Sequence, residues 1–142
     1  MKPERVFADT NLFLRYLTND VPAQADAVEE LLQLAAAHEL VLVTHSLVIA
    51  EIVWTLESYY RLPKNRVQEN VLALLNTPGL EVMDADLVLQ AIISYVDKNV
   101  DFIDAYSGAW LLAHDMKCAD TFDRQHFSRL PDVAVVIPGA VS

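Results

Sequence analysis

Four acidic residues stand where their side chains can meet and carry out metal-dependent chemistry. Asp9 follows a short apolar run, Glu51 interrupts an apolar helical pattern, and Asp104 stands at the start of another. Asp123 follows a short β-rich segment. Clustered carboxylates repel one another, and either protonation or a bound cation relieves that repulsion. Because the candidate ligands are all oxygens, the cation that they predict is Mg²⁺ or Mn²⁺.

A carboxylate-held divalent ion is suited to the hydrolysis of a phosphodiester bond. The ion activates a water for in-line attack on phosphorus and neutralises the charge that builds on the phosphate. One of the carboxylates would deprotonate the water, and Arg or Lys side chains would offset charge on the substrate. One or two ions fit this scheme, about 3.5–4 Å apart if there are two.

Each acid also has a structural explanation that the sequence leaves open. Asp9 is a good N-cap for a helix beginning near Leu12. Asp101 stands three residues before Asp104, which is a capping arrangement with the second acid near the positive end of the helix dipole. Asp123 is equally well explained by a turn.

Two of the acids are harder to explain as surface residues. Residues 47–54 are apolar except for Glu51, so we expect a buried helix in which a carboxylate costs several kcal/mol unless it is paired. No Arg or Lys within this helix can pair with it. Asp104 is followed by small residues, and we expect these to let the helix approach its neighbours closely and press Asp104 into the core: Ala105, Ser107, Gly108 and Ala109.

The chain alternates between short β-rich segments and helical patterns, which predicts parallel strands in an α/β domain. We expect three layers, α/β/α, with a mainly parallel central sheet whose carboxyl edge gathers the four acids. The expected strands are 5–8, 40–44, 80–83, 117–119 and 133–137. The expected helices are 12–17, 22–38, 47–60 with Ser46 as its cap, 64–76, 86–99, 102–114 and 125–130.

Composition narrows the classes of protein. A chain of 142 residues, 54% hydrophobic, fits one domain over residues 1–142. We expect a cytoplasmic protein without a membrane span, because no apolar run approaches 20 residues and the first residues lack a signal-peptide core. Cys118 is the only cysteine, so neither an internal disulfide nor a thiolate zinc cage is available. The net charge of −10 repels nucleic acid, so RNA binding would need cations and a local basic rim.

Four motifs in order carry a resemblance to a known family: Asp9-Thr10-Asn11, Glu51 in its apolar helix, Asp101-Phe102-Ile103-Asp104-Ala105, and Thr121-Phe122-Asp123 with Phe127 after it. Together they resemble the PIN-domain ribonucleases, in particular the VapC toxins of toxin–antitoxin pairs. The resemblance extends from Phe7 to Val136.

The resemblance implies a single PIN-like domain with three core acids, Asp9, Glu51 and Asp104. It makes Asp123 a fourth acid that is less uniformly required, with Asn11 and Thr121 as polar supports. Asp101 competes with Asp104 for the third place, and the small residues after Asp104 favour the latter.

The resemblance also implies Mg²⁺- or Mn²⁺-dependent endonucleolytic cutting of RNA, a homodimer, and inhibition by a cognate antitoxin. One surface fits these partners independently of the resemblance. Four apolar residues stand near three cations, and they would form a dimer or antitoxin surface with a basic rim: Trp54, Tyr59, Tyr60 and Leu62, near Arg61, Lys64 and Arg66. Ordinary core and solvated helix ends explain these residues equally well.

Two other classes of protein also place an acid after the first strand. A phosphatase or phosphotransfer receiver is disfavoured, because Asp9 is not part of an Asp-x-Asp pair and no Lys ends a late strand. A catalytically silent PIN-fold module for protein interaction or RNA binding remains the alternative, although acids at all four places argue against it.

Overall fold

The fold is described from a computed structural model that covers residues 2–122, 127–130 and 132–139. The chain divides into two compact units, Met1–Ala85 and Asp86–Ser142, here called the N-terminal and C-terminal units. Each unit is described by itself.

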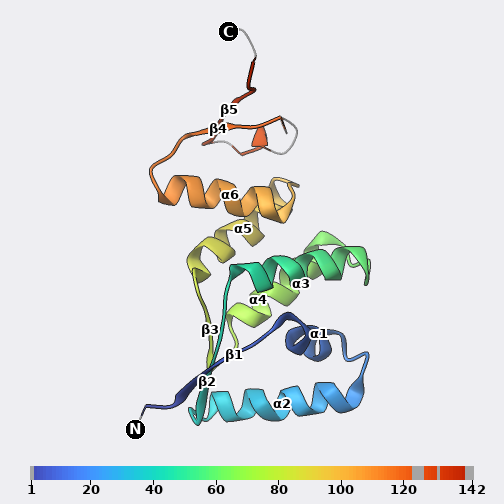
Figure 1. Ribbon diagram of the computed structural model, residues 1–142. Helices are drawn as coiled ribbons and strands as arrows, with labels where there is room; N and C mark the ends of the chain where they lie inside the picture. Colours follow the sequence, from blue (N-terminus) through green and yellow to red (C-terminus); the bar gives the residue numbers. More distant parts are fainter. Residues whose placement is uncertain (1, 123–126, 131, 140–142) are drawn as a thin grey trace. The chain divides into compact units, whose positions relative to one another are not determined.

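A parallel sheet of three strands forms the centre of the N-terminal unit (Figure 1). β1 (Glu4–Phe7) pairs with β2 (Leu40–Thr44), and β2 pairs with β3 (Leu80–Val82). The register sets Phe7 opposite Val43 and Thr44 opposite Val82. Because every strand runs in the same direction, the residues that follow the three strands lie along one edge of the sheet.

Four helices connect these strands. Pro22 begins the second helix, where its fixed φ and missing N–H are tolerated. The third helix was expected to have Ser46 as its cap, but His45 holds the N-cap position with extended backbone and Ser46 is already helical. The helices are α1 (Thr10–Thr18), α2 (Pro22–Ala36), α3 (Ser46–Ser58) and α4 (Lys64–Leu75).

The helices of the N-terminal unit pack on one another and on the sheet. α1 contacts α2 and α3, α3 contacts α4, and α2 and α4 contact β2 and β3 respectively. Gly79 precedes β3 with a φ of +79°, and a Cβ there would lie 2.3 Å from the carbonyl oxygen of Ala35. Only glycine fits both this φ and this approach to the end of α2. The largest fully buried side chains here include Phe13, Leu42, Ile49, Ile52, Leu56 and Leu74.

Two helices and a pair of parallel strands have described bounds in the C-terminal unit. Tyr95 and Phe102 are buried with their rings edge to face, 6.4 Å between centroids. Arg129 donates a hydrogen bond to the carbonyl of Asn99, which joins the described residues 127–130 to the loop between the helices. Part of the expected helix 125–130 lies outside the described residues. The elements are α5 (Ala85–Asp97), α6 (Phe102–Ala113), β4 (Cys118–Asp120) and β5 (Ala134–Val136).

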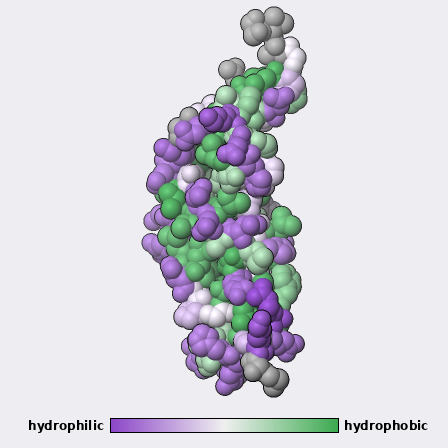
Figure 2. All heavy atoms as spheres, turned by 90° about the vertical axis from the view of Figure 1, so that its left-hand side faces the viewer, coloured by the Kyte–Doolittle hydropathy of each residue, from purple (hydrophilic) through white to green (hydrophobic). Residues whose placement is uncertain are grey.

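The surface carries large apolar side chains among the charged ones. Tyr59 is 75% exposed and Trp54 is 67% exposed. Figure 2 shows hydrophobic side chains between hydrophilic ones on one face of the molecule. Among the residues that the structure describes, no helix combines the length and the apolar character that a membrane crossing requires.

A polar network around Asp20 joins the loop between α1 and α2 to the turn after α3. Tyr60 Oη donates to Asp20 Oδ2 at 2.6 Å, and Thr18 Oγ1 donates to Oδ1 at 3.0 Å. Arg15 approaches the same carboxylate at 3.3 Å. The Tyr60 hydrogen bond is the main reason that the pKa of Asp20 lies below its usual value of 3.8, with smaller contributions from Thr18 and Arg15 against the opposing effect of desolvation.

The Asp20 network predicts a pH-dependent contribution to stability. Because the pKa of Asp20 is lower in the folded chain, the network stabilises above pH 3.8 and is lost as the pH falls through the folded pKa. We expect Tyr60→Phe to raise the pKa of Asp20, followed by NMR titration of its carboxyl carbon. The difference in unfolding free energy between the wild type and Tyr60→Phe should shrink below pH 3.8. Tyr59→Phe is the control, and a difference that is unchanged in acid would contradict this account.

Candidate functional site

Asp9 lies between β1 and α1, two residues after the strand ends at Phe7. Ala8 N donates to Val43 O at 2.9 Å, so the strand pairing extends to the residue before Asp9. Asp9 is the N-cap of α1, and its Oδ1 accepts a hydrogen bond from Thr10 N at 2.7 Å. The capping role considered from the sequence is thus confirmed, although α1 begins at Thr10 rather than near Leu12. The Asp9 side chain is exposed, and its Oδ2 accepts no hydrogen bond from another described residue.

Glu51 lies on the exposed side of α3, so the expectation that it is buried was wrong. α3 buries only one side, and Glu51 shares the other with Leu47 and Trp54, at the spacing of neighbours on a helix face. Glu51 has no ion pair with any Arg or Lys among the described residues. Its carboxylate is therefore solvated rather than neutralised by a base. The buried side consists of Val48, Ile49, Ile52, Val53 and Leu56.

The sheet topology brings Asp9 and the start of α3 to the same edge. Asp9 follows β1, α3 begins two residues after the end of β2, and the two strands are neighbours. An α-helix rises about 1.5 Å per residue, so Glu51 lies about 7.5 Å along α3 from Ser46. Two of the predicted acids therefore belong to the carboxyl side of this sheet.

Two further residues of this edge were not singled out from the sequence. Thr44 ends β2, and its Oγ1 is buried without a hydrogen-bond partner among the described residues. A buried hydroxyl left unpaired costs about 1–3 kcal/mol, which makes it unusual. Asp84 follows β3 as an exposed residue with a left-handed φ of 59°. The available signal was the same as for Asp9, a polar residue at or just after the end of a strand.

Asp101 and Asp104 lie at the start of α6 in the C-terminal unit. Asp101 holds the N-cap position in extended backbone, without a side-chain capping hydrogen bond. Asp104 is in the first turn of α6 and is half-buried, so it is not pressed into the core as expected.

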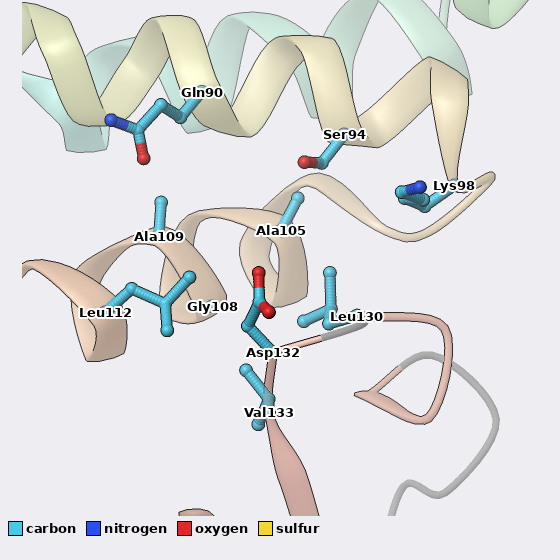
Figure 3. A pocket seen from close by; sticks show the side chains of 10 residues that line it. All are labelled: Gln90, Ser94, Lys98, Ala105, Gly108, Ala109, Leu112, Leu130, Asp132 and Val133. Carbon is cyan, nitrogen blue, oxygen red and sulfur yellow. The ribbon is translucent and has the colours of Figure 1, made fainter. Parts of the chain in front are cut away.

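The small residues after Asp104 border a pocket in the C-terminal unit (Figure 3). Leu130 Cδ1 lies 2.7 Å from the position that a Cβ on Gly108 would take. Ser94 and Gln90 line the opposite wall from α5, and the pocket has a volume of about 130 Å³. Gly108 thus makes room for Leu130, and the small side chains border a cavity rather than a close contact between helices.

The remaining predicted residues are the two polar supports and the fourth acid. Asn11 is exposed in the first turn of α1. Thr121 is half-buried, and its N–H donates to Val136 O at 2.9 Å, which continues the β4–β5 pairing. Asp123 lies outside the described residues.

The donor chemistry fits a hard divalent cation, because every predicted ligand contributes a carboxylate, amide or hydroxyl oxygen. Asp9 and Glu51 belong to the N-terminal unit, whereas Asp101 and Asp104 belong to the C-terminal unit. Within the part of the chain that is described, no group of three or more His, Cys, Asp or Glu is placed to hold a metal ion.

The capping role of Asp9 predicts which substitution leaves the fold intact. Asp9→Ala removes the hydrogen bond to Thr10 N and should lower the unfolding free energy by about 0.5–2 kcal/mol in urea denaturation. Asp9→Asn keeps an equally good cap, so its unfolding free energy should be close to that of the wild type. An equal loss of unfolding free energy in Asp9→Ala and Asp9→Asn would show that the charge of Asp9, rather than its capping hydrogen bond, stabilises the fold.

Comparison with known proteins identifies the family of this chain. The chain is similar to the solved structure of the Mycobacterium tuberculosis toxin VapC20, described as cleaving the sarcin–ricin loop, with 22% identity and a TM-score of 0.38. The alignment covers 90% of this chain and 96% of that one. A search of curated proteins finds no significant match. The family model of the PIN domain matches residues 6–133.

That match covers most of the chain, and the strand pairs are parallel throughout the described residues. The expected α/β fold of PIN type is confirmed, and the chain belongs to the PIN-domain family.

Proposed function

We propose that this protein is a divalent-metal-dependent endoribonuclease and the toxin of a type II toxin–antitoxin pair that acts in the cytoplasm. The match of residues 6–133 to the PIN domain is the observation that carries the proposal. The acids Asp9 and Glu51, which follow neighbouring parallel strands, support it.

Residues 1–142 form one PIN-like domain in this proposal. The family match begins in the N-terminal unit and ends in the C-terminal unit, so neither unit alone contains the matched sequence.

Asp9, Glu51, Asp104 and Asp123 hold Mg²⁺ or Mn²⁺, with Asn11 and Thr121 as polar supports and Asp101 as the alternative to Asp104. The ion supplies water activation and neutralises charge on the phosphate. Asp9 suits this role because its cap hydrogen bond occupies one carboxylate oxygen and orients the side chain. Glu51 suits it because its carboxylate is exposed and forms no ion pair with an Arg or Lys among the described residues.

RNA must approach a chain that carries 20 acids and 10 Lys and Arg residues. Three of those cations fall within residues 61–66, and Arg61 and Arg66 are exposed. Contacts between such side chains and phosphate supply most non-specific affinity for nucleic acid. This basic run therefore supports the approach of an RNA strand to the N-terminal unit.

A homodimer and a cognate antitoxin complete the proposal. Ordinary core, the other explanation of the aromatic residues near the basic run, does not apply to Trp54 and Tyr59, because both are more than 60% exposed. Exposed aromatic residues are typical anchors of protein interfaces. Tyr60 and Leu62 are half-buried and do not belong to that exposed set.

Replacement of the proposed ligands should abolish RNA cleavage while the chain stays folded. We expect Asp9→Asn and Glu51→Gln each to lower the rate of cleavage at least about 100-fold, because each removes a charge that holds the ion. Cleavage of total RNA in Mg²⁺ or Mn²⁺ is measured, with circular dichroism as the check on folding. The matched control is Glu29→Gln, an exposed acid on α2. Undiminished cleavage by both variants would contradict the assigned ligands, whereas a folded wild type that does not cut RNA would favour the catalytically silent module.

Metal binding should also be visible without any RNA. An ion that binds only the folded chain stabilises it, by about 2.7 kcal/mol at a concentration 100 times its dissociation constant. The thermal midpoint should therefore rise with Mn²⁺ in the wild type and in Glu29→Gln, and rise much less in Asp9→Asn and Glu51→Gln. An equal rise in all four proteins would mean that the ion binds elsewhere.

A further inference from the structure

A second pocket, here called the Tyr60 pocket, lies between α1, α3 and α4 of the N-terminal unit. Its volume is about 260 Å³, just below the roughly 300–1,000 Å³ of sites for drug-sized ligands. It therefore suits a smaller group than a drug-sized ligand. Its walls include Thr18, Leu56, Tyr60, Leu62, Arg66 and Asn70.

The aromatic wall of this pocket is held in place. Tyr60 Oη donates to Asp20 at 2.6 Å, and Asp20 is in turn held by Thr18 and Arg15. A ring with a fixed hydroxyl loses little freedom when a ligand stacks on it, so binding is less opposed by entropy. Tyrosine rings are stacking platforms for unpaired bases.

The polar wall has donors and an acceptor near each other. Asn70 Nδ2 donates to Arg66 O at 2.8 Å, whereas Asn70 Oδ1 accepts no hydrogen bond from another described residue. The exposed Arg66 side chain contacts Glu69 through Nε at 3.3 Å. An amide oxygen accepts from the exocyclic amino group of adenine or cytosine, and a guanidinium donates to phosphate.

The charge around the Tyr60 pocket favours a nucleic acid over other flat ligands. Arg66 lines the pocket, and Arg61 and Lys64 precede it within the same basic run. A base held in the pocket would leave its phosphate next to Arg66, the cation that lines the pocket.

We propose that the Tyr60 pocket binds one unpaired RNA base that carries an exocyclic amino group, stacked on Tyr60, with its phosphate on Arg66. The proposal rests on the proposed function, because it takes RNA as the substrate. The bound base lies outside the acid ligand set, so the pocket selects and orients the strand rather than cutting it.

The test measures RNA binding in the Asp9→Asn background, where the strand is not cut. The probe is single-stranded oligoadenylate with one 2-aminopurine, whose fluorescence falls on stacking, and oligouridylate is the comparison. Tyr60→Ala should weaken oligoadenylate binding about 5- to 150-fold and abolish the quenching. Tyr60→Phe keeps the ring and should keep the quenching. Tyr16→Ala, which removes a 41% exposed tyrosine ring of α1 that does not line the pocket, is the matched control and should bind as the parent does.

The polar wall is tested separately. Arg66→Gln should weaken binding of both strands and lower the slope of log affinity against log salt by about one. Asn70→Leu should reduce the preference for oligoadenylate over oligouridylate. If Tyr60→Ala fails to fold, Asn70→Leu and Arg66→Gln decide the outcome.

Several results would overturn the proposal. Unchanged oligoadenylate binding by Tyr60→Ala, or an equal loss in Tyr16→Ala, would exclude stacking on Tyr60. An unchanged preference in Asn70→Leu would exclude the amide contact. A protein partner lost in Tyr60→Ala while RNA binding persists would assign the pocket to that protein. If the wild type cuts RNA and the pocket variants bind normally, only the pocket proposal fails, whereas a wild type that neither binds nor cuts RNA overturns both proposals.

Discussion

Parallel pairing of β1, β2 and β3 is the constraint on which the candidate site depends. Three strands that run in the same direction end at the same edge, and a polar residue follows each strand within two residues. Asp9 follows the first strand, His45 the second, and Asp84 lies two residues beyond the third. The helices between the strands then fix how far from this edge their own side chains lie, as α3 does for Glu51. The topology of the sheet thus determines which side chains lie at this edge.

Much of the fold follows from local patterns in the sequence. β2 was expected at residues 40–44 and occupies exactly that span because a continuous β-rich run has no competing helical period. Helix ends were less exact, since capping depends on backbone geometry: His45, which has no side-chain capping bond, precedes Ser46 at the N-cap of α3. The capping role of Asp9 was predicted correctly, because an acid between a strand and a helix is a favoured N-cap residue.

The environment of the candidate acids was harder to predict than their positions. Glu51 stands in an apolar run, yet Leu47 and Trp54 share its exposed face, and sequence hydrophobicity does not distinguish a buried apolar residue from an exposed one. Asp104 is half-buried, and Gly108, one turn further along α6, makes room for Leu130, a residue far from it in the chain. Such contacts are set by tertiary packing, which no local pattern specifies. The shared ligand role of the four acids therefore stays a prediction.

The same sheet has a consequence for how the protein is made. β1 pairs with β2 at Glu4 and Leu40, and β2 pairs with β3 at Leu42 and Leu80, so each pairing must close a long loop of chain. Such non-local pairing forms slowly, because the entropy of loop closure is lost first. During translation, the first strand must wait for the third to leave the ribosome before the edge bearing Asp9 is complete. A nascent chain whose third strand is still inside the ribosome therefore lacks the complete edge. The cell has the time between synthesis of β1 and release of β3 before that edge exists.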